Sequence, residues 1–192
     1  MSQEVEALLR GPNNWIDCPG MGAYLSPFLD MYRKSAIPPV LTLEGREGLC
    51  KQQLAKGIAA IFYCETHSAC GRCPACYAVA EDTQEELLIL CEDEERIKLD
   101  AAVSLQEHLT YKSIGGIHKH PRIVILGNSD RLVDQAANRL LKTLEEPPEN
   151  TFIIMTTSRV GNVLETIRSR TVLWKLEPAP LEESLLWCKG RS

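Results

Sequence analysis

Five short apolar runs, spaced along the chain between segments of helical periodicity, constrain the fold most strongly. They are rich in valine, isoleucine and leucine and cover residues 40–43, 87–90, 123–126, 152–155 and 172–176. Apolar positions in residues 51–61 and 134–145 recur with the spacing of helices that bury one face. Strands that alternate with helices indicate a parallel sheet covered by its crossover helices. The sequence therefore predicts an α/β fold with a parallel five-stranded sheet flanked by helices.

The size and charge of the chain limit what it can do alone. Its 192 residues suit one domain with a small appendage, and no apolar run reaches the roughly 18 residues that a membrane helix needs. The polar start of the chain lacks a signal-peptide core, so we expect a cytoplasmic protein with no membrane partner. The net charge of −5 disfavours nucleic-acid binding by the isolated chain, because proteins that neutralise many phosphates are usually basic.

A strand–loop–helix segment that begins near residue 40 partly matches a phosphate-binding loop. A working loop reads G-x-x-x-x-G-K-[ST]; its backbone amides and lysine hold phosphate, and its hydroxyl binds Mg²⁺. Gly45, Gly48 and Lys51 fit this pattern. Cys50 replaces the second glycine, where we expect its side chain to crowd the loop, and Gln52 replaces the hydroxyl ligand. The match is weak by itself, because the two glycines could also form an ordinary strand–helix turn.

The strand at residues 122–126 lacks the acidic residues that Mg²⁺-dependent ATP hydrolysis needs at its end. Gly127 and Asn128 follow it, and neither side chain has a charge that would bind metal or polarise water. Asp130 is predicted to be a helix N-cap. Because the hydroxyl ligand is missing as well, we predict that the chain does not hydrolyse ATP. The lysine of the loop leaves open the binding of ATP or ADP without turnover.

Three consecutive motifs lie between residues 138 and 171. Residues 138–148 read N-R-L-L-K-T-L-E-E-P-P, and residues 164–171 read L-E-T-I-R-S-R-T. Between them is a strand that ends in Thr157. In this order the motifs resemble those of the AAA+ clamp-loader subunits of bacterial DNA polymerase III, except that Thr171 stands where the family usually has cysteine. The resemblance covers roughly residues 10–188 and implies an AAA+ P-loop-type sheet, with Thr157 as the polar residue that senses the γ-phosphate.

The same resemblance implies how the chain is divided. Residues 1–176 correspond to the AAA+ nucleotide-binding-type domain. Residues 177–192 form a short helical tail, the start of the lid and collar that family members continue into. Pro178 and Pro180 mark this boundary in the sequence, because proline interrupts regular structure.

Arg170 occupies the position of the arginine in the family's Ser-Arg-Cys motif. The resemblance implies that Arg170 reaches in trans into the ATP site of a neighbouring subunit, with Arg168 in a structural role. The alternative is a surface arginine paired with a nearby carboxylate. An arginine finger kept without the hydrolytic residues implies a non-hydrolysing, stator-like clamp-loader subunit. Its implied partners are the tau/gamma and delta subunits and, through the assembly, the sliding clamp and primed DNA.

Three other functions remain open from the sequence. The chain could be a degenerate AAA+ protein that binds ATP, a zinc-containing nucleic-acid-binding module, or a truncated relative without function. Turnover abolished by Lys51→Ala would favour the first, and salt-sensitive DNA binding by the isolated chain would favour the second.

Four of the eight cysteines fall within 13 residues, at Cys64, Cys70, Cys73 and Cys76. Four thiolates at this spacing suit a closed tetrahedral Zn²⁺ site, which would be structural because no coordination position is open. An iron–sulfur cluster, redox disulfides and a lost metal site are the alternatives, and His67 is a substitute ligand. The clamp-loader resemblance implies an inserted small zinc module at about residues 64–76. The cysteines without a partner pattern are expected to be plain thiols: Cys18, Cys91 and Cys188.

Overall fold

The computed structural model describes residues 18–90, 96–110 and 120–189, which belong to two compact units. Of the described residues, the first unit contains 18–37, 47–84 and 176–189, and the second contains 38–46, 85–90, 96–110 and 120–175. Both units are therefore assembled from segments that are not contiguous in the sequence.

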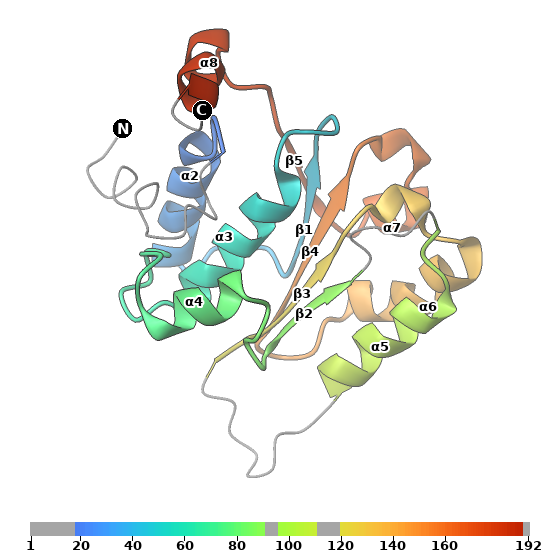
Figure 1. The fold of residues 1–192 in the computed structure, drawn as a ribbon. Helices are drawn as coiled ribbons and strands as arrows, with labels where there is room; N and C mark the ends of the chain where they lie inside the picture. Colours follow the sequence, from blue (N-terminus) through green and yellow to red (C-terminus); the bar gives the residue numbers. More distant parts are fainter. Residues whose placement is uncertain (1–17, 91–95, 111–119, 190–192) are drawn as a thin grey trace. The chain divides into compact units, whose positions relative to one another are not determined.

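The second unit contains a five-stranded parallel sheet with the strand order β2-β3-β4-β1-β5 (Figure 1). The inner strands β1, β3 and β4 are almost entirely buried, which explains why they are continuous apolar runs and not alternating ones. The predicted α/β class, the parallel five-stranded sheet and the positions of its strands are confirmed. The strands are β1 (Val40–Glu44), β2 (Leu87–Leu90), β3 (Arg122–Leu126), β4 (Thr151–Thr157) and β5 (Val172–Lys175).

Helices α5 (Leu99–Thr110) and α6 (Asp134–Glu145) pack on one face of this sheet. Their buried side chains, including Leu105 and Leu140, share a core with every second residue of β3 and β4. Three short helices follow strands at the carboxyl edge of the sheet. The 3₁₀ helix η1 (Ser129–Arg131) comes after β3, while η2 (Val160–Asn162) and α7 (Glu165–Arg168) come after β4. The short helices η1, η2 and α7 thus line the carboxyl edge of the sheet, the edge at which the residues predicted from the AAA+ resemblance lie.

The described part of the first unit is helical: α2 (Gly22–Arg33), α3 (Lys51–Tyr63), α4 (Pro74–Ala80) and α8 (Leu181–Lys189). Helices α2 and α3 meet through aromatic rings, with the Phe28 and Phe62 centroids 6.0 Å apart and those of Tyr32 and Phe62 5.3 Å apart, both edge to face. Helix α3 is buried on nearly all sides over its last seven residues. Alanine and glycine in that stretch allow neighbouring segments to approach closely.

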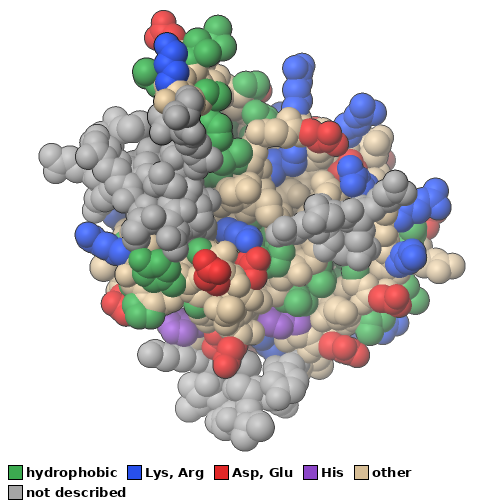
Figure 2. All heavy atoms as spheres, in the orientation of Figure 1, with side chains coloured by type: hydrophobic (Ala, Val, Ile, Leu, Met, Phe, Trp, Pro, Cys, Tyr) green, Lys and Arg blue, Asp and Glu red, His purple; other side chains and the backbone are tan. Residues whose placement is uncertain are grey.

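Helix α8 is exposed on its apolar side. Leu181 and Leu186 expose 74% and 71% of their surface, and Figure 2 shows hydrophobic side chains at the surface over α8. None of the helices in the described ranges is long and apolar enough to cross a membrane.

Candidate functional site

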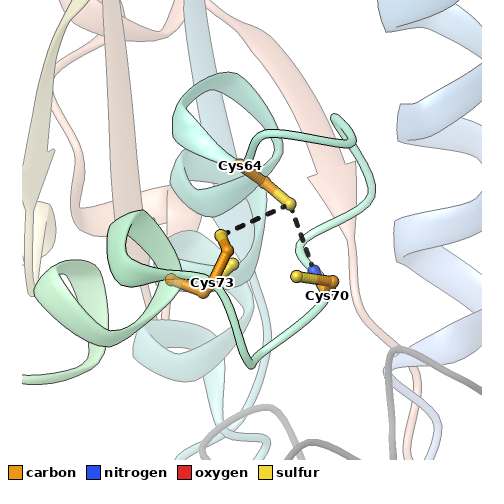
Figure 3. Close-up of side chains that lie close together, drawn as sticks. Cys64, Cys70 and Cys73 are labelled. Atoms are coloured by element: carbon orange, nitrogen blue, oxygen red, sulfur yellow. Dashed lines mark hydrogen bonds between the residues drawn. The ribbon is translucent and has the colours of Figure 1, made fainter.

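The sulfurs of four cysteines lie close together between the end of α3 and the first turns of α4, and Figure 3 labels three of these residues, Cys64, Cys70 and Cys73. The four Sγ atoms all lie within 4.8 Å of one another, and those of Cys64 and Cys73 are 3.9 Å apart. A tetrahedral zinc ion with Zn–S bonds of about 2.3 Å places its sulfurs about 3.8 Å apart. The predicted quartet of Cys64, Cys70, Cys73 and Cys76 is therefore brought together in a geometry that fits a four-sulfur metal site.

The local backbone explains how these cysteines meet. Cys64 follows the last residue of α3, and Cys73 is the N-cap of α4, with Pro74 in the first helical position. In the connection, three residues with positive φ turn the chain back on itself: His67, Ala69 and Gly71. The backbone amide of Cys70 donates a hydrogen bond to the Cys64 sulfur at 3.4 Å. Three of the four cysteines are also buried, and Cys70 is partly exposed, so the turn shields most of the quartet from solvent.

A hydrogen bond between the side chains of Cys64 and Cys76 shifts the pKa values of these two cysteines in opposite directions. The Cys76 thiol donates to Cys64 and thereby lowers the pKa of Cys64, with further contributions from the Thr66 hydroxyl and the Cys70 amide. The same bond and burial raise the pKa of Cys76. In the metal-free chain the thiolate, the form that binds metal, is therefore more favoured at Cys64 than at Cys76.

His67 is not part of the quartet. Its Nδ1 lies 2.9 Å from the Tyr32 hydroxyl and 3.2 Å from the Ile61 carbonyl oxygen. The ring therefore links the turn to α2 and α3, and four cysteines suffice without it.

The residues predicted to form the phosphate loop divide between the two units. Gly45 directly follows β1 in the second unit, where its amide donates to the Thr157 carbonyl at 3.1 Å and extends the β1–β4 ladder. Gly48 belongs to the first unit and has φ +86°, a conformation that favours glycine. Lys51 is the first residue of α3. Gly48 thus lies in a turn shortly before α3, and binding of a nucleotide by these residues stays a prediction.

Cys50 adopts the left-handed conformation, with φ 50° and ψ 34°, directly before α3. Its sulfur forms a disulfide with Cys18, with the Cα atoms 6.4 Å apart. The prediction that Cys18 is a plain thiol is therefore wrong. The sequence could not indicate this bond, because its two cysteines are 32 positions apart and form no recognisable spacing motif. Cys188 is exposed and is not disulfide-bonded, and Cys91 lies outside the described residues.

At the carboxyl edge of the sheet, Asp130 joins the end of β3 to the end of β4. Its Oδ1 accepts hydrogen bonds from the Thr157 hydroxyl at 2.9 Å and from the Ser158 amide at 3.3 Å. The prediction of Asp130 as a helix N-cap is wrong, since Asn128 holds that position in η1 and Asp130 lies within the helix. Thr157, predicted to be sensor-like, is fully buried, and its hydroxyl donates to this carboxylate in the isolated chain.

We expect Asp130→Ala to lower the free energy of unfolding by about 1–3 kcal/mol, because it leaves the buried Thr157 hydroxyl without its acceptor. Asp130→Asn keeps an acceptor oxygen and should lose less. Urea unfolding of the three proteins measures the difference. Equal stability of the native chain and Asp130→Ala would show that the carboxylate does not hold the two strand ends together.

Arg170 follows α7 and is hydrogen-bonded on every side of its guanidinium within its own chain. Its Nε donates to the Glu145 carboxylate at 2.7 Å, and its second terminal nitrogen pairs with the same oxygen. The other terminal nitrogen donates to the Thr166 carbonyl at 2.6 Å and to the Ser169 hydroxyl at 3.1 Å. In the isolated chain Arg170 therefore forms an ion pair with Glu145, which corresponds to the alternative interpretation of a surface arginine paired with a carboxylate.

Sequence reasoning missed two residues near Arg170. Glu145 lies in the L-E-E-P-P motif, but its part in holding an arginine 25 residues away depends on how α6 and α7 pack. Thr42 of β1 lies 2.8 Å, hydroxyl to hydroxyl, from Thr171. The sequence shows that Thr171 stands in place of the family's cysteine, but it does not show that the Thr171 hydroxyl contacts Thr42.

Known proteins similar to this chain belong to the family that the three motifs between residues 138 and 171 resemble. Residues 22–180 match the family described as DNA polymerase III, delta subunit. The chain is 30% identical over 158 residues to DNA polymerase III subunit delta' of Bacillus subtilis, and the aligned region covers 80% of this chain and 47% of that protein. It is 29% identical over 153 residues to subunit delta' of Escherichia coli, which covers 77% and 45% respectively. The chain spans about half the length of these relatives.

The fold is also shared with a solved structure, a DNA polymerase III gamma subunit-related protein from Thermotoga maritima. The two superpose with a TM-score of 0.60 at 22% identity over 82% of this chain and 47% of that one. At this identity the likeness concerns the fold alone. The match over most of the chain, together with the delta' relatives, shows that the chain belongs to the DNA polymerase III delta-subunit family.

Proposed function

We propose that this chain is a non-hydrolysing, stator-like subunit of the bacterial clamp loader and that it donates Arg170 to the ATP site of a neighbouring tau/gamma subunit. The observation that carries the proposal is an asymmetry in the family motifs. Arg170 keeps its place just after α7, whereas Gly127 and Asn128 stand where a metal-binding acid is needed. A chain of this kind can assist hydrolysis without performing it.

The contacts at the end of β3 support the absence of hydrolysis. Asp130 is the one acidic side chain of residues 127–130, and its Oδ1 already accepts two hydrogen bonds from residues at the end of β4. The amide of Asn128 donates to the Thr156 hydroxyl at 3.1 Å. These groups tie two strand ends together, and Gln52 offers no hydroxyl for Mg²⁺.

The ion pair of Arg170 with Glu145 is compatible with a role in trans. The Arg170 and Glu145 side chains are 31% and 46% exposed, and pairs open to solvent contribute only about 0–1 kcal/mol. A γ-phosphate with its greater negative charge is a stronger partner for a guanidinium fork. The neighbour's nucleotide could therefore replace Glu145 at little cost, while the Thr166 carbonyl continues to orient the side chain.

The cysteine quartet is proposed to hold a structural Zn²⁺ ion through Cys64, Cys70, Cys73 and Cys76. Four sulfur ligands favour zinc over hard cations such as Mg²⁺. A closed four-sulfur shell has no position for a substrate, so the ion would fix the connection between α3 and α4.

The proposed assembly consists of tau/gamma and delta subunits acting on the sliding clamp and primed DNA. Residues 1–176 would supply the AAA+ domain and residues 177–192 a helical tail. The exposed leucines of α8 favour a packing partner for that tail.

The isolated chain is expected to show no Mg²⁺-dependent ATP hydrolysis above background, and Lys51→Ala should leave that result unchanged. The test is a phosphate-release assay with purified native and variant chains, with an active tau/gamma subunit as the positive control. Turnover that Lys51→Ala abolishes would replace the stator proposal with a degenerate but working ATPase.

A further inference from the structure

Two cysteines outside the metal quartet are joined at the start of α3. We propose that Cys18 and Cys50 form a reversible thiol–disulfide site whose oxidation ties the phosphate-loop end of α3 to residues 18–24, and through them to the start of α8. The inference concerns chemistry that the clamp-loader proposal does not use, and it stands without that proposal.

The geometry of the pair suits a disulfide that can form and break. The Cα atoms are 6.4 Å apart, within the range found for disulfides. Both residues are half-buried, and Glu47 and Gly48 beside them are exposed. A small thiol or disulfide reagent can therefore reach the sulfurs from solvent.

The backbone of Cys50 gives a second reason to assign a role to its sulfur. The residue has φ 50°, in the left-handed region that glycine adopts far more easily than residues with a side chain. Its carbonyl accepts the first hydrogen bond of α3 from the Leu54 amide at 3.0 Å. Glycine would make the same turn without strain, so what cysteine adds at this position is the bond to Cys18.

Residues 18–24 connect this bond to the C-terminal part of the first unit. The Gly20 amide donates to the Glu183 carboxylate at 2.7 Å, and the Glu177 amide donates to the Tyr24 hydroxyl at 2.6 Å. A Cβ on Gly20 would lie 3.2 Å from the Cβ of Ala179, so the two segments pack tightly. In the oxidised chain a continuous path of one covalent bond and these contacts therefore runs from the start of α3 to α8.

The chemistry balances with a small-molecule disulfide such as oxidised glutathione as the oxidant. One cysteine thiolate attacks a glutathione sulfur, forms a mixed disulfide and releases one glutathione thiolate. The second cysteine thiolate then attacks its partner's sulfur and releases the second glutathione. The two protein thiols lose two protons and two electrons, and the glutathione disulfide is reduced to two thiols. Excess reduced glutathione reverses both steps.

The first test maps the bond. The native chain with zinc bound is equilibrated in glutathione buffers of increasing oxidation, quenched in acid, alkylated and digested for mass spectrometry. We expect a cross-linked peptide pair that contains Cys18 and Cys50, and its loss in reduced buffer. Separate glutathione adducts on the two cysteines without the cross-link, or pairing of either with another cysteine, would overturn the proposal.

The second test measures the link to α8 by hydrogen exchange of the oxidised and reduced native chain. Amides of residues 20–24 and 177–184 are expected to exchange at least about fivefold more slowly after oxidation, because a cross-link restricts the opened states. Cys18→Ser should not respond to oxidation. Unchanged exchange in both segments of the native chain would overturn the coupling even if the disulfide forms.

Discussion

Arg170→Ala is expected to remove the ability of this chain to accelerate ATP hydrolysis by an adjacent tau/gamma subunit. Arginines supplied in trans contribute about 10³–10⁵ in rate in other NTPases, so we expect at least about a tenfold loss at the shared site. Arg170→Lys should not restore it, because an ammonium lacks the planar fork that pairs with phosphate oxygens. Single-turnover hydrolysis with excess assembly over ATP measures the effect on the chemical step.

Arg168→Ala is the matched control for this prediction. Arg168 lies two residues earlier, is exposed, and pairs only loosely with Glu165 at 3.9 Å. Its loss should leave the rate unchanged. An equal loss of rate in Arg168→Ala and Arg170→Ala would indicate that general surface charge, and not a placed guanidinium, supports the neighbouring site.

Removal of zinc is expected to unfold the connection between α3 and α4 and to release about one ion per chain, as four thiolates complete one tetrahedral shell. Cys76→Ala should lower the bound zinc at least about tenfold, because the remaining three sulfurs leave the shell open. A chromogenic chelator measures the zinc, and circular dichroism follows the helices. Iron in the purified chain, or zinc content unaffected by Cys76→Ala, would contradict the assignment.

Zinc affinity is also expected to rise with pH. The raised pKa of Cys76 favours its protonated form in the metal-free chain, so zinc binding must compete with that proton. The lowered pKa of Cys64 means that Cys64 adds little to this dependence. Competition titrations between pH 6 and 8 test it, roughly the range in which thiol protons compete with zinc. Cys188→Ala, which alters an exposed cysteine outside the quartet, is the control and should bind zinc as the native chain does.

Local pattern was sufficient for the sheet and for the cysteine quartet. The strands could be predicted because buried parallel strands are continuous apolar runs between turns. The quartet could be predicted because its ligands lie within 13 residues of one another. In both cases the information is contained in short stretches of the chain.

Long-range pairings could not be predicted in this way. An aspartate before a helix usually caps it, but the Asp130 carboxylate bonds to Thr157, 27 residues away. The Glu145–Arg170 pair and the Cys18–Cys50 bond likewise join residues whose separation follows no rule of periodicity. Helix α5 was also not predicted, because it buries only Ala102, Leu105 and Leu109 in a segment that mixes polar and apolar residues. Tertiary packing decides each of these.

The most direct test of the account is the steady-state rate of ATP hydrolysis by matching tau/gamma and delta subunits with sliding clamp and primed DNA, with and without this chain. If Arg170 acts in trans, the rate rises when the native chain is present and does not rise with Arg170→Ala. A rate that the native chain leaves unchanged, under conditions in which it binds the other subunits, would contradict the stator role.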